Sequence, residues 1–313
     1  MPAVTRPAGA ALTNRKERTT VSLQTALFEP APPPIPVLAE ADLILANSSA
    51  GKDSQAMLHH LVQLADVAGA LDRVQVVHCD LGDVEWPGTR ELAAAQAEHY
   101  GLPFHLRRRT QGDLFTQIAE RHQRLRAKGD TTTPAWPSSA ARYCTSSQKR
   151  EVVHALITEL VGRLDLDRPA RVINCLGLRA AESAARARRK DVSTDERATS
   201  GRRTVTTWLP ILRWSDRMVW QAIADAGTPY HPAYDSGMKR LSCSFCVLAD
   251  EASLITAARL RPQLADRYLA LEEELGHTFK HGLSMARIVA KARALGPLPL
   301  RADGSALRMA LAA

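Results

Sequence analysis

The sequence predicts an α/β fold built on a doubly wound parallel sheet. Short apolar runs alternate with helical patterns of about 10–15 residues, and this alternation is typical of parallel βαβ units. Of the 313 residues, 45% are hydrophobic and 24% are charged, so the chain can bury a sizeable core. A charged helical pattern follows residue 250. We therefore expect a helical carboxyl-terminal part after the sheet.

The expected elements follow from these runs in order. The pattern predicts strands at 43–46, 74–79, 104–106 and 171–178, and helices at 54–67, 89–99, 113–125, 148–164 and 215–226. Residues 179–204 break the pattern with charged and small side chains. We expect this segment to be a mobile loop over a site.

Three parts are expected along the chain. Residues 1–38 form a flexible proline-rich arm, because the run EPAPPPIP at 29–36 cannot continue a helix. Residues 39–230 form the nucleotide-binding α/β domain. Residues 231–313 contain a Cys-x-x-Cys segment and the terminal helices.

Charge and cysteine content indicate the class of partner and the compartment. The formal net charge is +8 and the sequence pI about 9.5, which favours an adenine nucleotide, nucleic acid or another anionic substrate. A solvated basic surface is the other interpretation. No apolar run approaches the ~18–20 residues that cross a bilayer. Five cysteines without a secretory segment predict a cytoplasmic protein, in which close cysteine pairs bind metal or undergo redox chemistry.

The stretch NSSAGKDS at 47–54 lies between the first strand and the first helix. In open α/β sheets this turn is the usual phosphate cradle, since glycine allows close backbone approach and the helix amino terminus favours an anion. A simple helix cap by Asp53 or Ser54 is the alternative. The candidate nucleotide ligands in this turn are Ser48, Ser49, Gly51, Lys52, Asp53 and Ser54.

The turn differs from the common ATPase loop, because Ala46 stands where that motif needs its first glycine and Asp53 follows the lysine. The run SAGKDS instead resembles the S-G-G-x-D-S pyrophosphate loop of the adenine-nucleotide α-hydrolase (PP-loop ATP pyrophosphatase) superfamily. Ala50 replaces the first glycine of that pattern. We expect this replacement to be tolerated with a negative φ at Ala50.

Further segments strengthen the resemblance. VVHCDLGDVEWPGT at 76–89, RYCTSSQKR at 142–150, LGLRAAESAAR at 176–186, WLPILRWSDRMVW at 208–220 and RLSCSFCVLAD at 240–250 follow in order. Together they resemble the phosphoadenosine phosphosulfate reductase family in its broad sense, which includes DNA-phosphorothioation enzymes and phage and bacterial relatives. The resemblance covers about residues 43–281. It implies that His78 and Asp80 lie at the nucleotide edge.

The cysteine pattern departs from the best-known members of that family. The thioredoxin-dependent reductases carry a cysteine in a carboxyl-terminal Glu-Cys-Gly tail, whereas this chain has no cysteine after Cys246. Adenylyl-sulfate reductases carry a Cys-Cys pair plus a Cys-x-x-Cys pair, whereas here only Cys144 accompanies the pair at 243 and 246. A standard assimilatory reductase is therefore disfavoured.

Three thiols, Cys144, Cys243 and Cys246, are the candidate metal ligands. Their spacing suits a 4Fe–4S cluster with one open iron that binds hydrosulfide. Zinc with His231 as fourth ligand, and plain thiol chemistry, stay open as alternatives. Cys79 and Cys175 lie in predicted strands and are more often buried hydrophobes.

Arginine suits the departing pyrophosphate, because its planar fork binds phosphate bidentately and keeps its proton. Arg179 and Arg186 are the candidates, with Lys149 behind them and Glu182 to orient Arg179 or Mg²⁺. The alternative interpretation of the charged run at residues 186–190 is a solvated surface without a role in the site. The expected catalytic residues are Lys52, Asp53, Cys144, Arg179 and Arg186.

These residues predict an ATP-dependent adenylation with Mg²⁺, followed by sulfur transfer from a donor such as a cysteine desulfurase. The first alternative is a reductase of adenylyl-sulfate or phosphoadenylyl-sulfate at the same cradle. The second is a nucleotide-sensing, nucleic-acid-binding subunit without catalysis, although aromatic residues make up only 5% of the chain.

Overall fold

The structure is a computed structural model that describes residues 34–298. Within these residues, six strands form one sheet in the order β3-β2-β1-β4-β6-β5. All neighbouring pairs are parallel except the edge pair β5–β6. The predicted doubly wound α/β fold is confirmed. The strands are β1 (Leu43–Ser48), β2 (Val74–Cys79), β3 (Phe104–Arg107), β4 (Ala170–Leu176), β5 (Val192–Thr194) and β6 (Arg203–Trp208).

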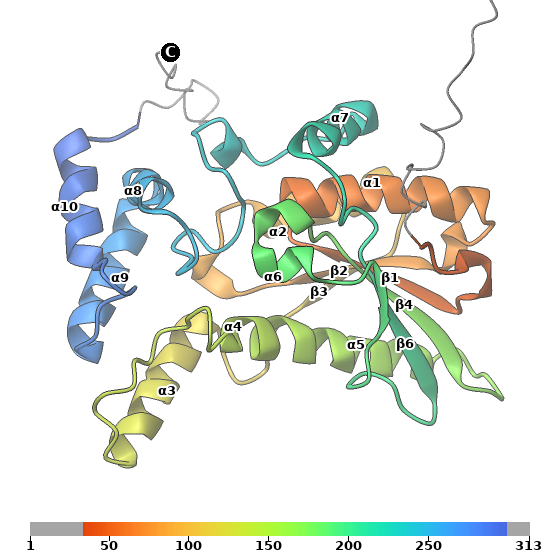
Figure 1. Ribbon diagram of the computed structural model, residues 1–313, viewed down its shortest axis with the longest axis horizontal. Helices are drawn as coiled ribbons and strands as arrows, with labels where there is room; N and C mark the ends of the chain where they lie inside the picture. The colour runs from red at the N-terminus through yellow and green to blue at the C-terminus, as the bar shows by residue number, and fades with distance from the viewer. Residues whose placement is uncertain (1–33, 299–313) are drawn as a thin grey trace, which may run out of the picture. The chain divides into compact units, whose positions relative to one another are not determined.

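Helices cover both faces of this sheet (Figure 1). Alternate side chains of β1 explain why: Ile44 packs into one cluster with helices α1 and α7, and Leu45 packs into another with α5. Successive side chains of a strand point to opposite faces. The helices are α1 (Lys52–Val67), α2 (Thr89–His99), α3 (Leu114–Ala127), α4 (Tyr143–Thr145), α5 (Glu151–Gly162), α6 (Ala184–Ala187), α7 (Asp216–Ala226), α8 (Glu251–Leu260), α9 (Pro262–Leu275) and α10 (Met285–Leu295).

A third hydrophobic cluster joins α3 to the carboxyl-terminal helices. Phe115 of α3 and Phe279 both contact the ring of Tyr268 on α9, and Val84 and Leu254 belong to the same cluster. Residues after 230 therefore pack against segments that precede them in the chain. The predicted domain boundary at residue 230 stays a prediction, and most of the arm expected over 1–38 lies outside the described residues.

Two predicted segments differ from the observed elements. The expected helix at 148–164 is shorter, because the π-helix η5 (Ser146–Arg150) precedes α5. The segment 179–204, expected to be a mobile loop, contains the turn η6 (Ala180–Glu182), α6 and β5. It is ordered because β5 pairs with β6, so that backbone groups of the charged run join the sheet.

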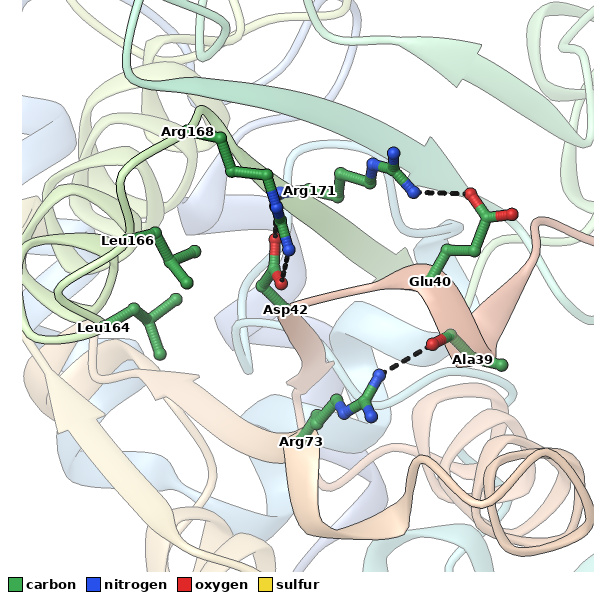
Figure 2. A pocket seen from close by; sticks show the side chains of 8 residues that line it. All are labelled: Ala39, Glu40, Asp42, Arg73, Leu164, Leu166, Arg168 and Arg171. Carbon is green, nitrogen blue, oxygen red and sulfur yellow. Dashed lines mark hydrogen bonds and ion pairs between the residues drawn. The ribbon is translucent and has the colours of Figure 1, made fainter.

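The amino-terminal edge of the sheet holds a shallow cavity of about 450 Å³. Figure 2 shows the ion pairs in it: Arg168 donates to Asp42 at 2.7 and 2.8 Å, and Arg171 donates to Glu40 at 2.6 Å. Asp42 precedes β1 and Arg168 precedes β4, so these pairs tie the starts of the two strands together. We assign this cavity a structural role.

The opposite edge is where the topology places ligands. The chain winds to one side after β1 and to the other side after β4, which makes the crevice between their carboxyl ends a topological switch point. The NSSAGKDS turn follows β1 and Gly177 follows β4. Both segments of the predicted nucleotide site therefore meet at one crevice.

Candidate functional site

The phosphate loop, residues 48–54, is shaped by its own serine hydroxyls. Ser48 Oγ accepts from Ala50 N at 3.1 Å, and Ser54 Oγ accepts from Ser49 N at 3.1 Å while donating to Gly51 O at 2.9 Å. Ser48 and Ser54 are buried. These two hydroxyls therefore fix the turn through bonds within the loop.

Ala50 corrects the prediction of a negative φ. Its φ is +53°, in the left-handed region that L-residues with a Cβ rarely adopt. The side chain is fully buried, and Ser48 Oγ holds the amide. The loop must bend here before Gly51 begins α1, so an alanine takes a conformation that glycine would adopt without strain.

Two glycines allow the walls of the crevice to approach. A Cβ on Gly177 would stand 2.8 Å from both Asp53 O and Ser54 Cα, and a Cβ on Gly51 would stand 3.3 Å from Leu241 O. Gly177 was not among the predicted site residues, although a glycine directly after a buried strand is a signal of close backbone approach. Gly177 brings the end of β4 against the start of α1.

A network of charged side chains crosses this junction. Arg179 Nε donates to Asp53 Oδ1 at 2.5 Å, and Arg179 Nη2 donates to Asp216 Oδ1 at 2.6 Å. Lys52 Nζ lies 3.4 Å from Asp53 Oδ2 and 3.3 Å from Asp216 Oδ1. Lys52 and Arg179 are buried. The predicted residues Lys52, Asp53 and Arg179 thus lie together, and Asp216 at the start of α7 is an addition that sequence reasoning did not find.

Glu182 links this network to a second group of arginines. Its carboxylate accepts from Arg179 N at 3.0 Å and from Arg240 Nη2 at 2.9 Å, and it also pairs with Arg186. Burial and, to a smaller extent, the nearby guanidinium groups of Arg240 and Arg142 together lower the pKa of Arg186 to about 10. Arg186 still carries its charge at neutral pH, so positive charge gathers beside the crevice.

His78 lies in β2 and Asp80 directly follows that strand, and both make internal contacts. The ring of His78 lies 3.0 Å from Ser48 O and 3.1 Å from Glu85 Oε2. Asp80 Oδ1 accepts from Gly82 N at 2.8 Å. His78 thus supports the backbone of the phosphate loop from behind, and Asp80 shapes the turn after β2.

The three candidate thiols come from two segments, and two of them, Cys243 and Cys144, interact electrostatically with Lys149. Cys144 lies in α4, and Cys243 and Cys246 lie in the loop before α8. Burial raises the pKa of Cys144 and of Cys243, and each pKa is raised further by the neighbouring Cys246. Burial acts to lower the pKa of Lys149, but Cys243 and Glu85 hold it above its ordinary value.

The donor set suits a soft metal in its chemistry, but the ligands are not pre-arranged. Within residues 34–298, no three His, Cys, Asp or Glu side chains already form a metal-binding group. The zinc alternative with His231 is wrong, because His231 Nε2 lies 3.0 Å from Pro87 O and Nδ1 accepts from Ala233 N at 3.1 Å. Both ring nitrogens are therefore occupied by the backbone.

The other two cysteines differ from each other. Cys175 is fully buried within β4, and burial raises its pKa. Cys79 Sγ lies 3.8 Å from Lys149 O, and burial raises its pKa to about 11. Cys175 is therefore a core residue, whereas Cys79 lies near Lys149, at the margin of the cluster formed by Cys144, Cys243 and Cys246.

A sequence model of the phosphoadenosine phosphosulfate reductase domain matches residues 44–249. The chain belongs to this family. The match contains the phosphate loop, Arg179 and all three candidate thiols. Membership in the phosphoadenosine phosphosulfate reductase family supports a nucleotide-utilising enzyme of sulfur chemistry.

Solved structures with a similar fold are distant in sequence. Phosphoadenylyl-sulfate reductase from Candida auris, in a phosphate complex, is 17% identical with a TM-score of 0.39 over 64% of this chain and 80% of that chain. FMN adenylyltransferase from Candida glabrata, with FMN and an ATP analogue, is 12% identical with a TM-score of 0.39 over 66% of this chain and 56% of that chain.

A third structure is a U34-tRNA thiolase from Methanococcus maripaludis with its 4Fe–4S cluster. It is 11% identical, with a TM-score of 0.36 over 83% of this chain and 74% of that chain. A search of curated proteins gave no match. Among the described residues of this family member, no helix combines the length and the apolar character that a membrane span needs.

Proposed function

We propose that this protein is an ATP-pyrophosphatase-type sulfur-transfer enzyme that adenylates its substrate. One observation carries the proposal: the cysteine-bearing segment packs directly on the phosphate loop. Tyr234 OH accepts from Lys52 N at 2.9 Å and from Leu241 N at 3.2 Å. Leu241 lies two residues before Cys243. Tyr234 therefore holds the phosphate loop and the segment before Cys243 next to each other, so that a nucleotide site and a thiol site could act on the same substrate.

The first step is adenylation. A substrate oxygen attacks the α-phosphorus of ATP, a new P–O bond forms, and the bond to pyrophosphate breaks. Arg179 and Arg186 would stabilise the charge on the departing pyrophosphate, since guanidinium groups bind phosphate oxygens bidentately. Lys52 and the loop amides would hold the β- and γ-phosphates. Mg²⁺ would enter with the nucleotide, and Asp53 and Asp216 are the nearby carboxylates.

The second step is displacement by sulfur. A hydrosulfide-type sulfur attacks the adenylated carbon or phosphorus, and AMP leaves with the oxygen. Cys144, Cys243 and Cys246 would hold a 4Fe–4S cluster, which supplies an open iron that binds sulfide. Lys149 among these thiols stabilises negative charge there. Supply of sulfur by a desulfurase-type donor and a cytoplasmic location complete the proposal.

The test is pyrophosphate release by the purified full chain with ATP, Mg²⁺ and a mixture of candidate acceptors that includes DNA and RNA. We expect release that Arg179→Ala reduces at least a hundredfold, whereas Arg188→Ala, which changes an exposed arginine, leaves it unchanged. ATP binding without release of pyrophosphate would show a nucleotide sensor and contradict the proposal.

The cluster is tested separately by anaerobic purification and iron analysis. We expect a broad brown absorption that Cys243→Ala removes and Cys175→Ala keeps, because Cys175 is a core residue. Colourless protein without iron, obtained after anaerobic reconstitution, would exclude the cluster and leave thiol chemistry.

Family membership favours one second candidate, the reduction of adenylyl-sulfate or phosphoadenylyl-sulfate. In that reaction two electrons from a dithiol break the sulfur–oxygen bond, so that sulfite and the adenine nucleotide leave. Sulfite release from either sulfated nucleotide, without pyrophosphate release from ATP, would select it. The two assays therefore separate the candidates.

A further inference from the structure

A cavity of about 330 Å³ lies beside the phosphate loop, between the start of α1 and α7. Three aromatic side chains line it, Trp220, Tyr230 and Tyr234, together with Met238. Lys52, Lys239 and Asp216 form its polar end. The volume is at the small end of the range for ligand sites. Ser49, Gly51 and Arg179 do not line it, so the cavity adjoins the phosphate loop through Lys52.

The aromatic walls are held in place by contacts with one another and with α1. The ring of Trp220 packs edge-on against Tyr230 and Tyr234, with centroids 5.2 and 5.3 Å apart. Gln55 Nε2 of α1 donates to Thr228 O at 3.2 Å and Pro229 O at 3.1 Å, which anchors the segment that carries Tyr230. A ligand would therefore meet a pre-formed aromatic surface.

The polar end limits the chemistry of that ligand. Lys52 Nζ lies 5.9 Å from the centroid of the Tyr234 ring, so a ligand cation would be repelled where an aromatic cage would otherwise attract it. Asp216 supplies a carboxylate acceptor at the same end, and Lys239 is paired with Asp250 at 2.9 Å. Asp216 Oδ1 accepts from Arg179 at 2.6 Å, and the side chain of Asp216 is 63% exposed. A neutral flat ring that accepts from Lys52 and donates to Asp216 satisfies both groups.

We propose that this cavity binds an amino-bearing heteroaromatic ring of the nucleobase type, which belongs to the substrate that is adenylated. Flat rings stack on aromatic side chains, and an exocyclic amine can donate to Asp216. The inference rests on the proposed function, because it names the class of the second substrate. The adenine nucleotide itself lies in the crevice, on the other side of the ion pairs of Lys52 and Asp216.

The experiment measures nucleoside binding to the full chain saturated with a non-hydrolysable ATP analogue. Calorimetry with cytidine, adenosine, uridine and choline is expected to give binding of cytidine and adenosine, weaker binding of uridine and none of choline. Trp220→Ala should weaken the binding of cytidine about tenfold. Tyr230→Phe should keep it, because the ring that lines the cavity is retained while the hydroxyl bond to Asp235 is lost.

Three results would overturn the inference. The first is equal binding of cytidine to the wild type and to Trp220→Ala. The second is loss of nucleoside binding once the ATP analogue is saturating, which would make the cavity the base site of the nucleotide. The third is preferred binding of choline. Should Trp220→Ala fail to fold, Asp216→Asn replaces it, and an unchanged preference for cytidine over uridine then contradicts the inference.

Failure of the proposed function is distinguishable from these results. Without pyrophosphate release from ATP, but with nucleoside binding that depends on Trp220, the cavity assignment stands and the adenylation does not. With pyrophosphate release and no nucleoside binding, the adenylation stands and the cavity assignment fails.

Discussion

Arg179 is a buried charged side chain that forms ion pairs with the carboxylates of Asp53 and Asp216. Its side chain is 6% exposed and that of Asp53 is 17% exposed, whereas Asp216 is 63% exposed. The bond to Asp53 is therefore the less screened of the two, because water surrounds the other partner. Removing one member of a buried pair leaves an uncompensated charge, which costs more than the pair itself contributes.

Arg179→Ala should lower the free energy of unfolding by about 3 kcal/mol, because Asp53 and Asp216 lose the guanidinium that links them. Urea denaturation of the purified variant measures this change. Arg188→Ala is the matched control, because Arg188 is exposed and surface changes stay within about 0.5 kcal/mol. A loss in the Arg179 variant no larger than that of the control would show that the pair adds no stability.

At the level of elements, the turns after β1 and β4 determine where the candidate site lies. The sequence pattern predicts both strands and the phosphate loop, because apolar runs and serine-glycine turns are local signals. It does not predict the contact between Gly177 and Asp53, because that contact joins residues more than a hundred positions apart. The positive φ of Ala50 was missed for a related reason, since surrounding packing holds it.

Gly177→Ala should lower the free energy of unfolding by about 1–3 kcal/mol and weaken ATP binding. The added Cβ would stand 2.8 Å from the backbone of Asp53 and Ser54, so α1 must move away from β4. Gly162→Ala is the control, since nothing lies within 4 Å of its Cβ at the end of α5. Equal stability of the two variants, with equal affinity for ATP in calorimetry, would mean that the close approach is not required.

Across the whole molecule, the sheet could be predicted from the sequence. The cluster of Cys144, Cys243 and Cys246 could be predicted only in part. Alternating runs and helical patterns reveal a parallel sheet because both periodicities are local. The Cys-x-x-Cys pair is equally local, but its distance from Cys144 depends on how α4 and η5 pack. Lys149, which interacts with Cys243 and Cys144, lies in the π-helix η5, and local irregularities of this kind often mark functional segments.

Buried thiols also predict how the stability of the molecule depends on pH. Burial raises the pKa of Cys79 from 9.0 to about 11, and it raises the pKa of Cys175 as well. Between these values the folded protein keeps the proton that the unfolded chain releases. The contribution of the protonated thiols to the free energy of unfolding is therefore fully present below pH 9. It is lost as the pH rises toward 11, by about 2 kcal/mol for Cys79.

Urea denaturation of the full chain at pH 8, 9, 10 and 11 measures this loss. Cys79→Ala should flatten the dependence on pH, because the variant has no thiol at 79 to ionise on unfolding. Alkylation gives an independent reading: at pH 8 Cys79 should react slowly, since its thiolate fraction is small, and faster as the pH approaches 11. A pH dependence that is identical in wild type and Cys79→Ala would assign the loss to other groups, such as the buried tyrosines, whose pKa values burial also raises.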